Sequence, residues 1–292
     1  MNMAQQTVVI TGASSGIGLE AAKMFAARGW HVIAAGRTPE RCEAARSAIA
    51  AAAAEGGDVD FLTADISELA EARRLGEEIA RLAPEIHVLI NNAGGVRDAY
   101  YETSEGVEAT FAANHLGPFE LTRTLLPTLE RTAAGAPAGS VRIIAVSSLA
   151  HHRCPGMNWD DFNLGDDFDA NAAYCQAKLA NILFTRELAR RVADDGIVAQ
   201  SMHPGRVDSN FASHGDQTLR SHMTAADCDP PQKPAETLVW MATAPEAGFP
   251  TARFFFDKAE AEAAPQGSDD EAARRLWAAS EAAVEQVMAH NA

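Results

Sequence analysis

The chain has 292 residues, of which 47% are hydrophobic, so it is long enough to bury a substantial core and too apolar to be intrinsically disordered. Its net charge of −16 comes from 24 basic and 40 acidic residues, and such a surface repels nucleic-acid phosphates and anionic membranes. We therefore expect no nucleic-acid partner. In addition, no apolar run approaches the roughly 20 residues that a bilayer-spanning helix needs.

The four cysteines are not spaced as a zinc ribbon or as a CxxC redox pair; they are Cys42, Cys154, Cys175 and Cys228. We interpret them as free thiols of a reducing cytoplasm. The first six residues lack the basic-then-apolar pattern of a signal peptide and lead directly into a strand. These features predict a cytoplasmic protein.

Predicted strands and helices alternate along the whole chain. The expected strands are residues 7–11, 31–35, 58–63, 87–90, 141–146, 198–202 and 254–256. The expected helices are residues 19–27, 39–54, 68–82, 105–114, 117–131, 174–194 and 234–243, with an amphipathic tail helix at 268–288. The strands are apolar from end to end, as in a parallel sheet that helices cover on both faces. We predict an α/β fold, a single doubly wound Rossmann-like domain over residues 1–292 with a parallel sheet of about seven strands.

Two stretches break this alternation. Residues 151–173 are rich in Asp, Asn and Gly, and residues 210–232 are polar and end in two prolines. We expect both to lie as loops or short helices over the carboxyl edge of the sheet, where such folds bind ligands. In the first stretch, Trp159, Phe162 and Phe168 either line a hydrophobic pocket or anchor the segment.

A glycine-rich turn with the sequence TGASSGIG joins the first strand to the first helix. Glycines there let the backbone approach a pyrophosphate, and the helix N-terminus offers unpaired N–H groups and a positive dipole. The spacing differs from the G-x-G-x-x-G fingerprint, and an ordinary glycine-rich turn is the alternative. The position at the start of a βαβ unit favours a dinucleotide site formed by Gly12, Ser14, Ser15, Gly16, Ile17 and Gly18.

The second strand ends in Gly36-Arg37, at the position where NAD enzymes place an acidic residue on the ribose hydroxyls. A carboxylate would repel a 2′-phosphate, whereas the guanidinium of Arg37 can pair with it. Arg37 therefore predicts NADP(H), with NAD(H) less favoured. The alternative is a solvated surface arginine.

Tyr174 and Lys178 lie four residues apart, so they share one face of a predicted helix. A tyrosine has a reference pKa of about 10, and a nearby ammonium lowers it, which makes proton exchange with a substrate feasible. Ser148, at the end of the fifth strand, can donate a hydrogen bond to a substrate oxygen. Taken alone, the pair could be an ordinary Tyr-Lys contact on the surface or in the core. The catalytic interpretation therefore depends on its combination with the glycine-rich turn.

Six motifs in order now identify a family resemblance. They are TGxxxGxG at 11–18, NNAG at 91–94, NHLGPF at 114–119, VSS at 146–148, YxxxK at 174–178 and HPGxV at 203–207. The sequence resembles the short-chain dehydrogenase/reductase superfamily, and most of all its retinol dehydrogenase-like branch and bacterial relatives. The resemblance covers nearly the whole chain, including the tail SDDEAARRLW at 268–277.

This resemblance implies a role for each motif residue. Tyr174 would be the general acid/base, Lys178 would lower its pKa and bind the nicotinamide ribose, and Ser148 would orient the substrate oxygen. Asn114 would hold a proton-relay water on Lys178. The implied cofactor contacts are, besides the glycine-rich turn, Tyr174 and Lys178, the residues Arg37, Asp65, Ile66, Asn91, Ala93, Gly94, Pro204, Gly205, Val207 and Ser209. Residues 1–145 would mainly bind the cofactor, and residues 146–292 would carry the catalytic and substrate-binding groups.

Three departures from the common family pattern accompany these matches. The segment between Ser148 and Tyr174 is long, as in the retinol dehydrogenase-like branch, and Ser209 replaces the usual Thr. Ser147 competes with Ser148 for the catalytic role, and the family register favours Ser148. Membrane-bound relatives often carry an N-terminal anchor, which is absent here, so we expect a soluble protein.

Several other residues are expected to have structural roles and not catalytic or metal-binding ones. His151, His152 and Cys154 lack a matched second pair of ligands, so we expect no metal site. Cys175 follows Tyr174 but faces away from it around the helix, and we expect it to be packed. Residues 254–256 are expected in the sheet core.

The tail helix begins with a pattern of its own. Ser268 is a suitable N-cap, and Glu271 completes a capping box. The helix either covers the core or occupies the surface through which other family members oligomerise. We therefore expect a monomer or a homodimer.

The resulting hypothesis is an NADPH-dependent oxidoreductase that interconverts a hydrophobic ketone or aldehyde and its alcohol. One alternative is a reductase of carbon–carbon double bonds that uses the same site. The other is an NADP-sensing protein without turnover, but such proteins tend to lose the Tyr, Lys or Ser that this chain keeps.

Overall fold

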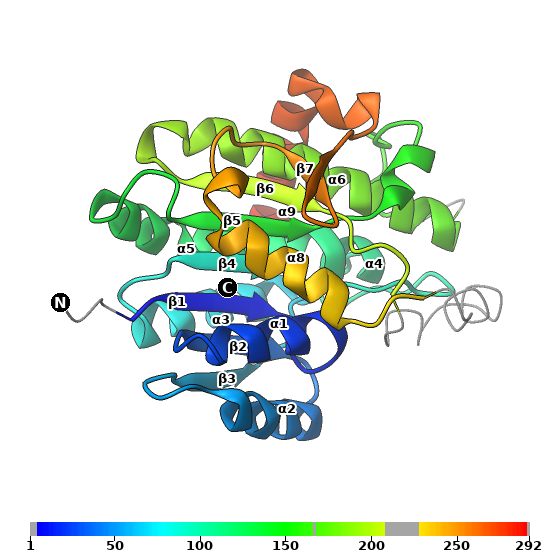
Figure 1. Ribbon diagram of the computed structural model, residues 1–292. Coiled ribbons are helices and arrows are strands. Elements are labelled where there is room, and N and C mark those ends of the chain that lie inside the picture. The colour runs from blue at the N-terminus through cyan, green and yellow to red at the C-terminus, as the bar shows by residue number, and fades with distance from the viewer. Residues whose placement is uncertain (1–4, 166–167, 208–227, 291–292) are drawn as a thin grey trace.

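The computed structural model describes residues 5–165, 168–207 and 228–290, and it contains one eight-stranded sheet with helices on both faces (Figure 1). The strand order is β3-β2-β1-β4-β5-β6-β7-β8. The strands are β1 (Thr7–Thr11), β2 (His31–Gly36), β3 (Val59–Thr63), β4 (Val88–Asn91), β5 (Arg142–Val146), β6 (Val198–Met202), β7 (Phe254–Phe256) and β8 (Ala259–Ala261). The α-helices are α1 (Gly16–Ala26), α2 (Pro39–Ala52), α3 (Leu69–Leu82), α4 (Ala109–Phe111), α5 (Gly117–Ala134), α6 (Ala170–Arg191), α8 (Gln232–Thr243) and α9 (Asp270–His290). Shorter helical segments are η1 (Ala112–Leu116), η2 (Leu149–Arg153), η3 (Ala193–Asp195), η5 (Pro245–Ala247) and η6 (Pro265–Ser268).

The prediction of an α/β doubly wound sheet is confirmed, with one strand more than the seven expected. Strands β1 to β7 pair in parallel, and β8 pairs antiparallel to β7 at the sheet edge. Asp257 and Lys258 join these two strands, both with positive φ (47° and 62°), as a primed hairpin turn requires. Neither residue is a glycine or an asparagine, so the sequence gives only a weak turn signal at this point.

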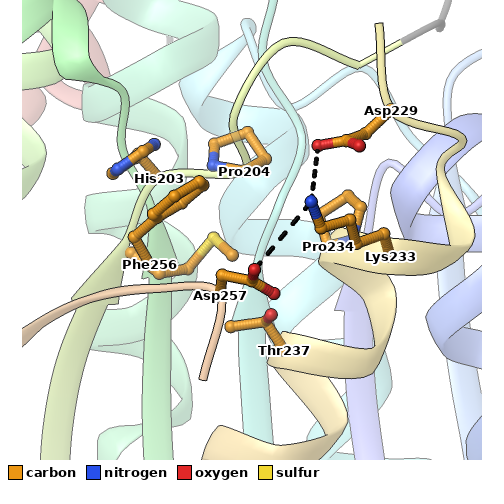
Figure 2. Close-up of a pocket in the computed structure, with 9 residues that line it drawn as sticks. His203, Pro204, Asp229, Lys233, Pro234, Thr237, Phe256 and Asp257 are labelled. Atoms are coloured by element: carbon orange, nitrogen blue, oxygen red, sulfur yellow. Dashed lines mark hydrogen bonds and ion pairs between the residues drawn. The ribbon is translucent and has the colours of Figure 1, made fainter. Parts of the chain in front are cut away.

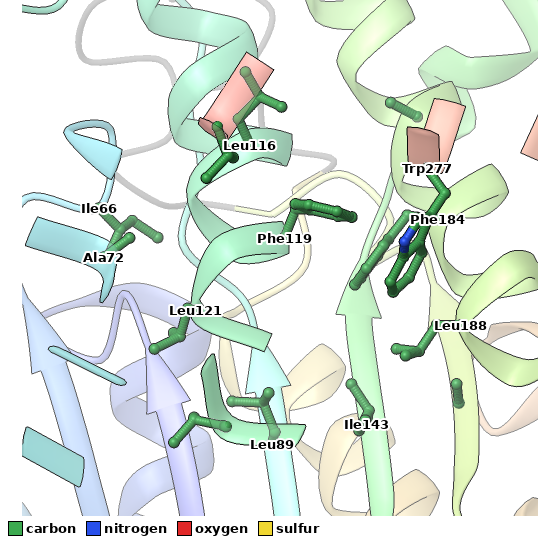
Figure 3. Close-up of a cluster of buried hydrophobic side chains, with 14 of the residues drawn as sticks. Ile66, Ala72, Leu89, Leu116, Phe119, Leu121, Ile143, Phe184, Leu188 and Trp277 are labelled. Carbon is green, nitrogen blue, oxygen red and sulfur yellow. The ribbon is translucent and has the colours of Figure 1, made fainter. Parts of the chain in front are cut away.

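Alternate residues of each strand pack on opposite faces of the sheet. On β1, Val9 belongs to a core shared with α3, α5 and α6, whereas Val8 and Ile10 belong to a core shared with α1 and α8. Figure 1 shows α1 and α8 on the near face of the sheet. Figure 3 shows part of the other core, where Phe119, Phe184 and Trp277 bring helices α5, α6 and α9 together. The tail helix therefore covers the core.

Acidic N-caps set the starts of three helices differently from the sequence prediction. The helix expected over 105–114 begins at Ala109, because the Glu108 carboxylate accepts from the Thr110 and Phe111 amides. Helix α6 begins at Ala170, four residues before the expected start, because Asp169 accepts from the amide of Ala172 at 2.7 Å.

The tail helix α9 begins two residues after the expected start at 268. Asp269, and not Ser268, is its N-cap, because the Asp269 carboxylate accepts from the amides of Glu271 and Ala272 at 2.8 and 3.0 Å. Glu271 pairs with Arg274 and not with the cap, so the predicted capping box is wrong. The charged Asp side chain next to Ser268 takes the capping role.

The aromatic residues between η2 and α6 anchor that segment. Phe162 stacks on Phe111 of α4 with ring centroids 5.3 Å apart, and Trp159 contacts Phe162 edge-on. The Arg275 guanidinium of α9 lies over the Trp159 ring at 4.4 Å. Gln176 of α6 adds a clamp, since its side chain accepts from the Asn158 amide and donates to the Phe162 carbonyl. For Trp159 and Phe162 the anchoring alternative is therefore the one observed.

The strand order reverses between β1 and β4, and doubly wound folds bind their ligands at the carboxyl ends of the strands at such a point. The loops after β1, β4, β5 and β6 all reach this edge of the sheet. Within the part of the chain that the structure describes, no helix is both long enough and apolar enough to cross a bilayer.

Candidate active site

The glycine-rich turn forms a backbone cradle at the N-terminus of α1. Gly12 and Gly16 have φ of +68° and +56°, which side chains rarely adopt, and Ser15 is the N-cap but makes no side-chain cap bond. Ser14 and Ile17 complete the turn. The first N–H groups of α1 therefore lack a capping side chain and can meet an anion.

Gly18, in the first turn of α1, packs directly against the cradle. A Cβ on Gly18 would lie 2.5 Å from the Gly12 carbonyl oxygen and 2.6 Å from Asn92 Nδ2, closer than real Cβ contacts. Only glycine lets α1 approach β1 this closely. The residues present fit a pyrophosphate, because they offer amide donors and no blocking side chain.

The loop after β4 fastens the cradle through Asn92. Its Nδ2 donates to the Thr11 carbonyl at 2.9 Å, and Thr11 Oγ1 accepts from the amides of Asn92 and Ala93 at 3.1 and 3.0 Å. The preceding residue, Asn91, is buried and donates instead to Thr122 Oγ1 on α5. The structure thus brings the side chain of Asn92, and not that of Asn91, to the cradle. Successive side chains of an extended chain point to opposite sides, so the sequence pattern alone could have separated these two neighbours.

Arg37 and Asp65 meet at the carboxyl ends of β2 and β3. The Arg37 guanidinium lies 3.6 Å from the Asp65 carboxylate, and the two side chains are 48% and 36% exposed. Asp65 Oδ1 also accepts from the amide of Ser67 at 3.1 Å, while Ile66 is buried. A Cβ on Gly36 would lie 3.0 Å from the Ser14 side chain, so Arg37 follows a residue in direct contact with the cradle.

Asn114 lies on the π-helical turn η1, a local distortion that often occurs at functional sites. Its Nδ2 donates to the carbonyls of Gly95 and Thr110 at 2.7 Å each, and its Oδ1 accepts from the Gly95 amide. A Cβ on Gly94 would collide with Asn114 Oδ1 and lie 3.4 Å from Lys178 Nζ. Gly94, Asn114 and Lys178 therefore converge.

The two serines after β5 have different partners. Ser147 is buried, and its Oγ donates to the Lys178 carbonyl at 2.7 Å, which ties the strand end to α6. Ser148 Oγ accepts from the Ala150 amide at 3.1 Å, and its hydroxyl lies near enough to Tyr174 to lower the pKa of that side chain. The structure thus places Ser148, and not Ser147, beside Tyr174.

Tyr174 and Lys178 lie one turn apart on α6, with Lys178 Nζ 5.5 Å from the centroid of the Tyr174 ring. Lys178 Nζ donates to the Val146 carbonyl at 3.1 Å. Burial lowers the pKa of Lys178 to about 7. Burial also raises the pKa of Tyr174 above its usual range, and the hydrogen bond from Ser148 opposes that rise.

The direction for Tyr174 is opposite to the lowered pKa expected from the sequence. The reason is desolvation, which outweighs the neighbouring groups because the phenolate would form away from water. Burial thus disfavours the charged form of each side chain. A phenolate and an ammonium formed together would stabilise each other across the short distance between them.

The loop after β6 supplies the remaining predicted contacts. Pro204 and Gly205 are partly exposed, and Val207 is buried and pairs with Asp229 in a parallel bridge. Ser209 and the predicted loop residues 210–227 lie outside the described residues.

A small pocket borders this loop on the side of α8 (Figure 2). Its polar groups pair with one another, since Lys233 Nζ lies 3.0 Å from Asp229 and 3.8 Å from Asp257. Its lining includes His203 and Pro204, but it does not include Ser148, Tyr174 or Lys178. The pocket therefore adjoins the candidate site and is not its centre.

Cys175 is buried, in agreement with the packed position expected for it. Among the described residues, no group of three or more His, Cys, Asp or Glu side chains is arranged to hold a metal ion. Phe254 and Phe255 are buried in the sheet, as predicted, but Phe256 is partly exposed and stacks on His203 at 4.2 Å.

Comparison with known proteins agrees with this geometry. Residues 6–219 match the family model for short chain dehydrogenases. Human retinol dehydrogenase 13 is 35% identical over 284 residues, which cover 94% of this chain and 83% of that protein. A Streptomyces protein named as a candidate daunorubicin C-13 ketoreductase is 38% identical over 285 residues, covering 96% and 92% of the two chains.

Two solved structures extend the comparison. An uncharacterized protein from Mycobacterium paratuberculosis has a TM-score of 0.73 and 32% identity, covering 97% of this chain and 94% of that one. The RhlG/NADP active-site complex from Pseudomonas aeruginosa has a TM-score of 0.68 and 26% identity, covering 87% and 94%. With the cradle and the Ser148–Tyr174–Lys178 arrangement at one edge of a doubly wound sheet, these matches show that the chain belongs to the short-chain dehydrogenase family, in its retinol dehydrogenase-like branch, and is an oxidoreductase of alcohol and carbonyl groups.

Proposed function

We propose that the protein is an NADPH-dependent reductase of hydrophobic ketones or aldehydes, reversible as an alcohol dehydrogenase, with Tyr174 as general acid/base. The observation that carries this proposal is the placement of Tyr174 beside Ser148 and one helical turn from Lys178, at the sheet edge that holds the cradle. In this proposal residues 1–145 mainly bind the cofactor, and residues 146–292 carry the reaction.

The cradle and Arg37 support NADP(H) as the cofactor. The pyrophosphate would meet the amides at the start of α1, and the half-exposed Arg37 guanidinium would pair with the 2′-phosphate. The Asp65 carboxylate lies 3.6 Å from that guanidinium, at the carboxyl edge of the sheet. The similar Pseudomonas structure is named as an NADP complex, in line with this choice.

When bound, the reduced nicotinamide supplies the hydride that converts a carbonyl carbon to an alcohol carbon. Side chains of the protein would stabilise and protonate the substrate's carbonyl oxygen. Ser148 would donate a hydrogen bond to the carbonyl oxygen as negative charge develops, and Tyr174 would transfer its hydroxyl proton to that oxygen. The Lys178 ammonium would stabilise the resulting phenolate, which counters the desolvation that raises the pKa of Tyr174.

An exposed leucine beside the catalytic groups supports a hydrophobic substrate. Leu149 follows Ser148 directly and leaves 53% of its surface exposed, in a chain whose large apolar side chains are mostly buried. Apolar surface next to a reacting centre favours a substrate that can cover it. The relatives named above act, by their names, on retinol and on a daunorubicin ketone, both of which are substrates with large apolar parts.

The test is a panel of ketones and aldehydes of increasing size, assayed by the loss of reduced-nicotinamide absorbance with NADPH and with NADH. The proposal predicts turnover that favours apolar carbonyl compounds, with a lower KM for NADPH than for NADH. A preference for NADH would contradict the cofactor assignment. Activity confined to conjugated double bonds would contradict the assigned reaction.

A further inference from the structure

His151 lies three residues beyond Ser148, on η2, and is completely buried. Its Nδ1 lies 2.5 Å from the Ser148 carbonyl oxygen, and its Nε2 lies 2.9 Å from the Ala264 amide nitrogen. The imidazole thus bridges the backbone of the proposed catalytic serine and the segment between β8 and η6. None of the roles assigned above requires such a bridge.

The two backbone partners determine where the imidazole proton lies. A carbonyl oxygen can only accept, so Nδ1 carries the hydrogen, and an amide N–H can only donate, so Nε2 is unprotonated. The ring is therefore neutral. Burial lowers the pKa of His151, although the hydrogen bond to the Ser148 carbonyl opposes this shift, so the neutral form that the two partners require is also the one that burial favours.

Two neighbouring rings pack against the imidazole. Phe254 contacts the His151 ring edge-on with centroids 5.1 Å apart, and the His152 ring lies at 4.1 Å. Ala264 is itself buried, next to a segment in which a Cβ on Gly267 would lie 2.9 Å from Ile182 of α6. The bridge therefore ends on fixed backbone at both sides.

The bridge completes the support of the Ser148 backbone. On one side the neighbouring Ser147 hydroxyl is tied to the Lys178 carbonyl, and on the other the Ser148 carbonyl is tied to His151. The Ser148 hydroxyl is then the group left to face Tyr174. Catalytic groups displaced by about 1 Å can lose on the order of a hundredfold in rate, so this support bears directly on turnover.

We propose that His151 is a positioning residue, whose neutral imidazole joins the Ser148 carbonyl to the Ala264 amide and thereby holds the Ser148 hydroxyl against Tyr174 and the substrate oxygen. The inference depends on the proposed function, because it assigns His151 a place in the same reaction. It also makes the segment after β8, remote in sequence, a part of the active site.

Two substitutions distinguish the contributions of the two hydrogen bonds that His151 makes, to the Ser148 carbonyl and to the Ala264 amide. His151→Asn places an amide N–H near the position of Nδ1, so it retains the bond to Ser148 and loses the bond to Ala264. His151→Phe keeps a ring at this buried position and loses both side-chain bonds, while the bond from its backbone amide to the Ser148 carbonyl remains. We expect kcat to fall about tenfold to a hundredfold in His151→Phe, with the Kd for NADPH unchanged, and to recover most of this loss in His151→Asn. The exposed neighbour provides the control, since His152→Phe should leave kcat within about twofold of the wild type.

Two readouts distinguish positioning from a purely structural role. The alkaline limb of the kcat–pH profile should shift upward in His151→Phe, because the Ser148 hydrogen bond that lowers the pKa of Tyr174 is weakened. In a Ser148→Ala background, His151→Phe should cause little further loss of kcat, since both changes act through one hydroxyl. Additive losses, or an unchanged pH profile, would overturn the proposal.

A wild-type protein that reduces no compound of the panel would refute the proposed function, and His151 would then be judged by crystal structures. A Ser148 hydroxyl that leaves Tyr174 in His151→Phe and returns in His151→Asn would support positioning. A Ser148 hydroxyl in the same place in all three proteins would overturn it.

Discussion

The two ends of the candidate site are built on different physical principles. The cradle after β1 consists of backbone amides and glycines within one short stretch, fastened by Thr11 and Asn92. The edge after β5 depends on side chains from the two serines after β5, from η2 and from α6, together with a backbone amide of the segment after β8. Changes at the first end should therefore alter cofactor affinity, whereas changes at the second should alter turnover.

The largest effect is expected at the side-chain end. Tyr174→Phe removes the transferable proton but keeps the ring, so kcat should fall about a thousandfold or more, while the Kd for NADPH stays within about threefold. Steady-state kinetics and isothermal titration calorimetry measure the two quantities. If turnover remains within tenfold of the wild type, Tyr174 is not the proton donor. The proposed division between a cofactor-binding end and a catalytic end would then be contradicted.

The next effect is expected in the cradle. Gly18→Ala places a Cβ 2.5 Å from the Gly12 carbonyl oxygen, so α1 must shift and NADPH affinity should fall on the order of a hundredfold. Gly135→Ala is the matched control, because a Cβ there lies 3.7 Å from its nearest neighbour, the Thr132 carbonyl oxygen. Calorimetry of both variants with NADPH, beside their thermal unfolding, tests the prediction. Equal affinities for the two variants would show that the close approach at Gly18 has no role in binding.

A smaller and more selective effect is expected at Arg37. Replacing it with Ser removes a charge-assisted hydrogen bond worth about 1.5–3 kcal/mol, so NADPH affinity should fall about tenfold to a hundredfold while NADH affinity is unchanged. Arg81→Ser, on the exposed end of α3, is the control. Equal losses for NADPH and NADH would mean that Arg37 supports the cradle and does not recognise the 2′-phosphate.

The smallest effect concerns stability against pH. Burial lowers the pKa of His203 to about 4, with His151 and His152 adding to the shift, and lowers that of His115 to about 3. The unfolded histidines bind protons near pH 6.5 and the folded ones do not, so their contribution is complete above about pH 6.5 and is lost as pH falls toward 4. Between pH 7 and 5 the free energy of unfolding should drop by about 1–2 kcal/mol per histidine.

Urea unfolding at the two pH values measures this drop. The same experiment on His203→Phe, which preserves an aromatic ring against Phe256, should give a smaller drop than the wild type. A drop of the same size in both proteins would assign the pH dependence to other groups.

The same contrast explains what could be predicted from the sequence. The cradle is local, so glycine spacing between a strand and a helix was enough to locate it. Ser148, Tyr174 and Lys178 were located by ordered motifs, but their geometry depends on the tertiary packing of α6 against β5. Desolvation in that packing reverses the expected direction of the Tyr174 pKa, and no pattern of residue types encodes it.

Other features depended on competition between neighbouring residues or on distant contacts. Asp269 displaced Ser268 as the cap of α9, and two non-glycine residues with positive φ created the unexpected strand β8. Asn91 ends β4 and Asn92 follows it, and their side chains have different partners, Thr122 and Thr11. The His151 bridge joins residues 113 positions apart, so only the folded chain shows it.

The most direct test of the central claim uses NADPH that carries deuterium at the transferable position, with a hydrophobic ketone accepted from the panel and mass spectrometry of the product. Hydride transfer to a carbonyl carbon, with Tyr174 as proton donor, predicts one deuterium on the new alcohol carbon and about a thousandfold slower product formation with Tyr174→Phe. Deuterium on a former carbon–carbon double bond, or alcohol formed without deuterium, would contradict the account.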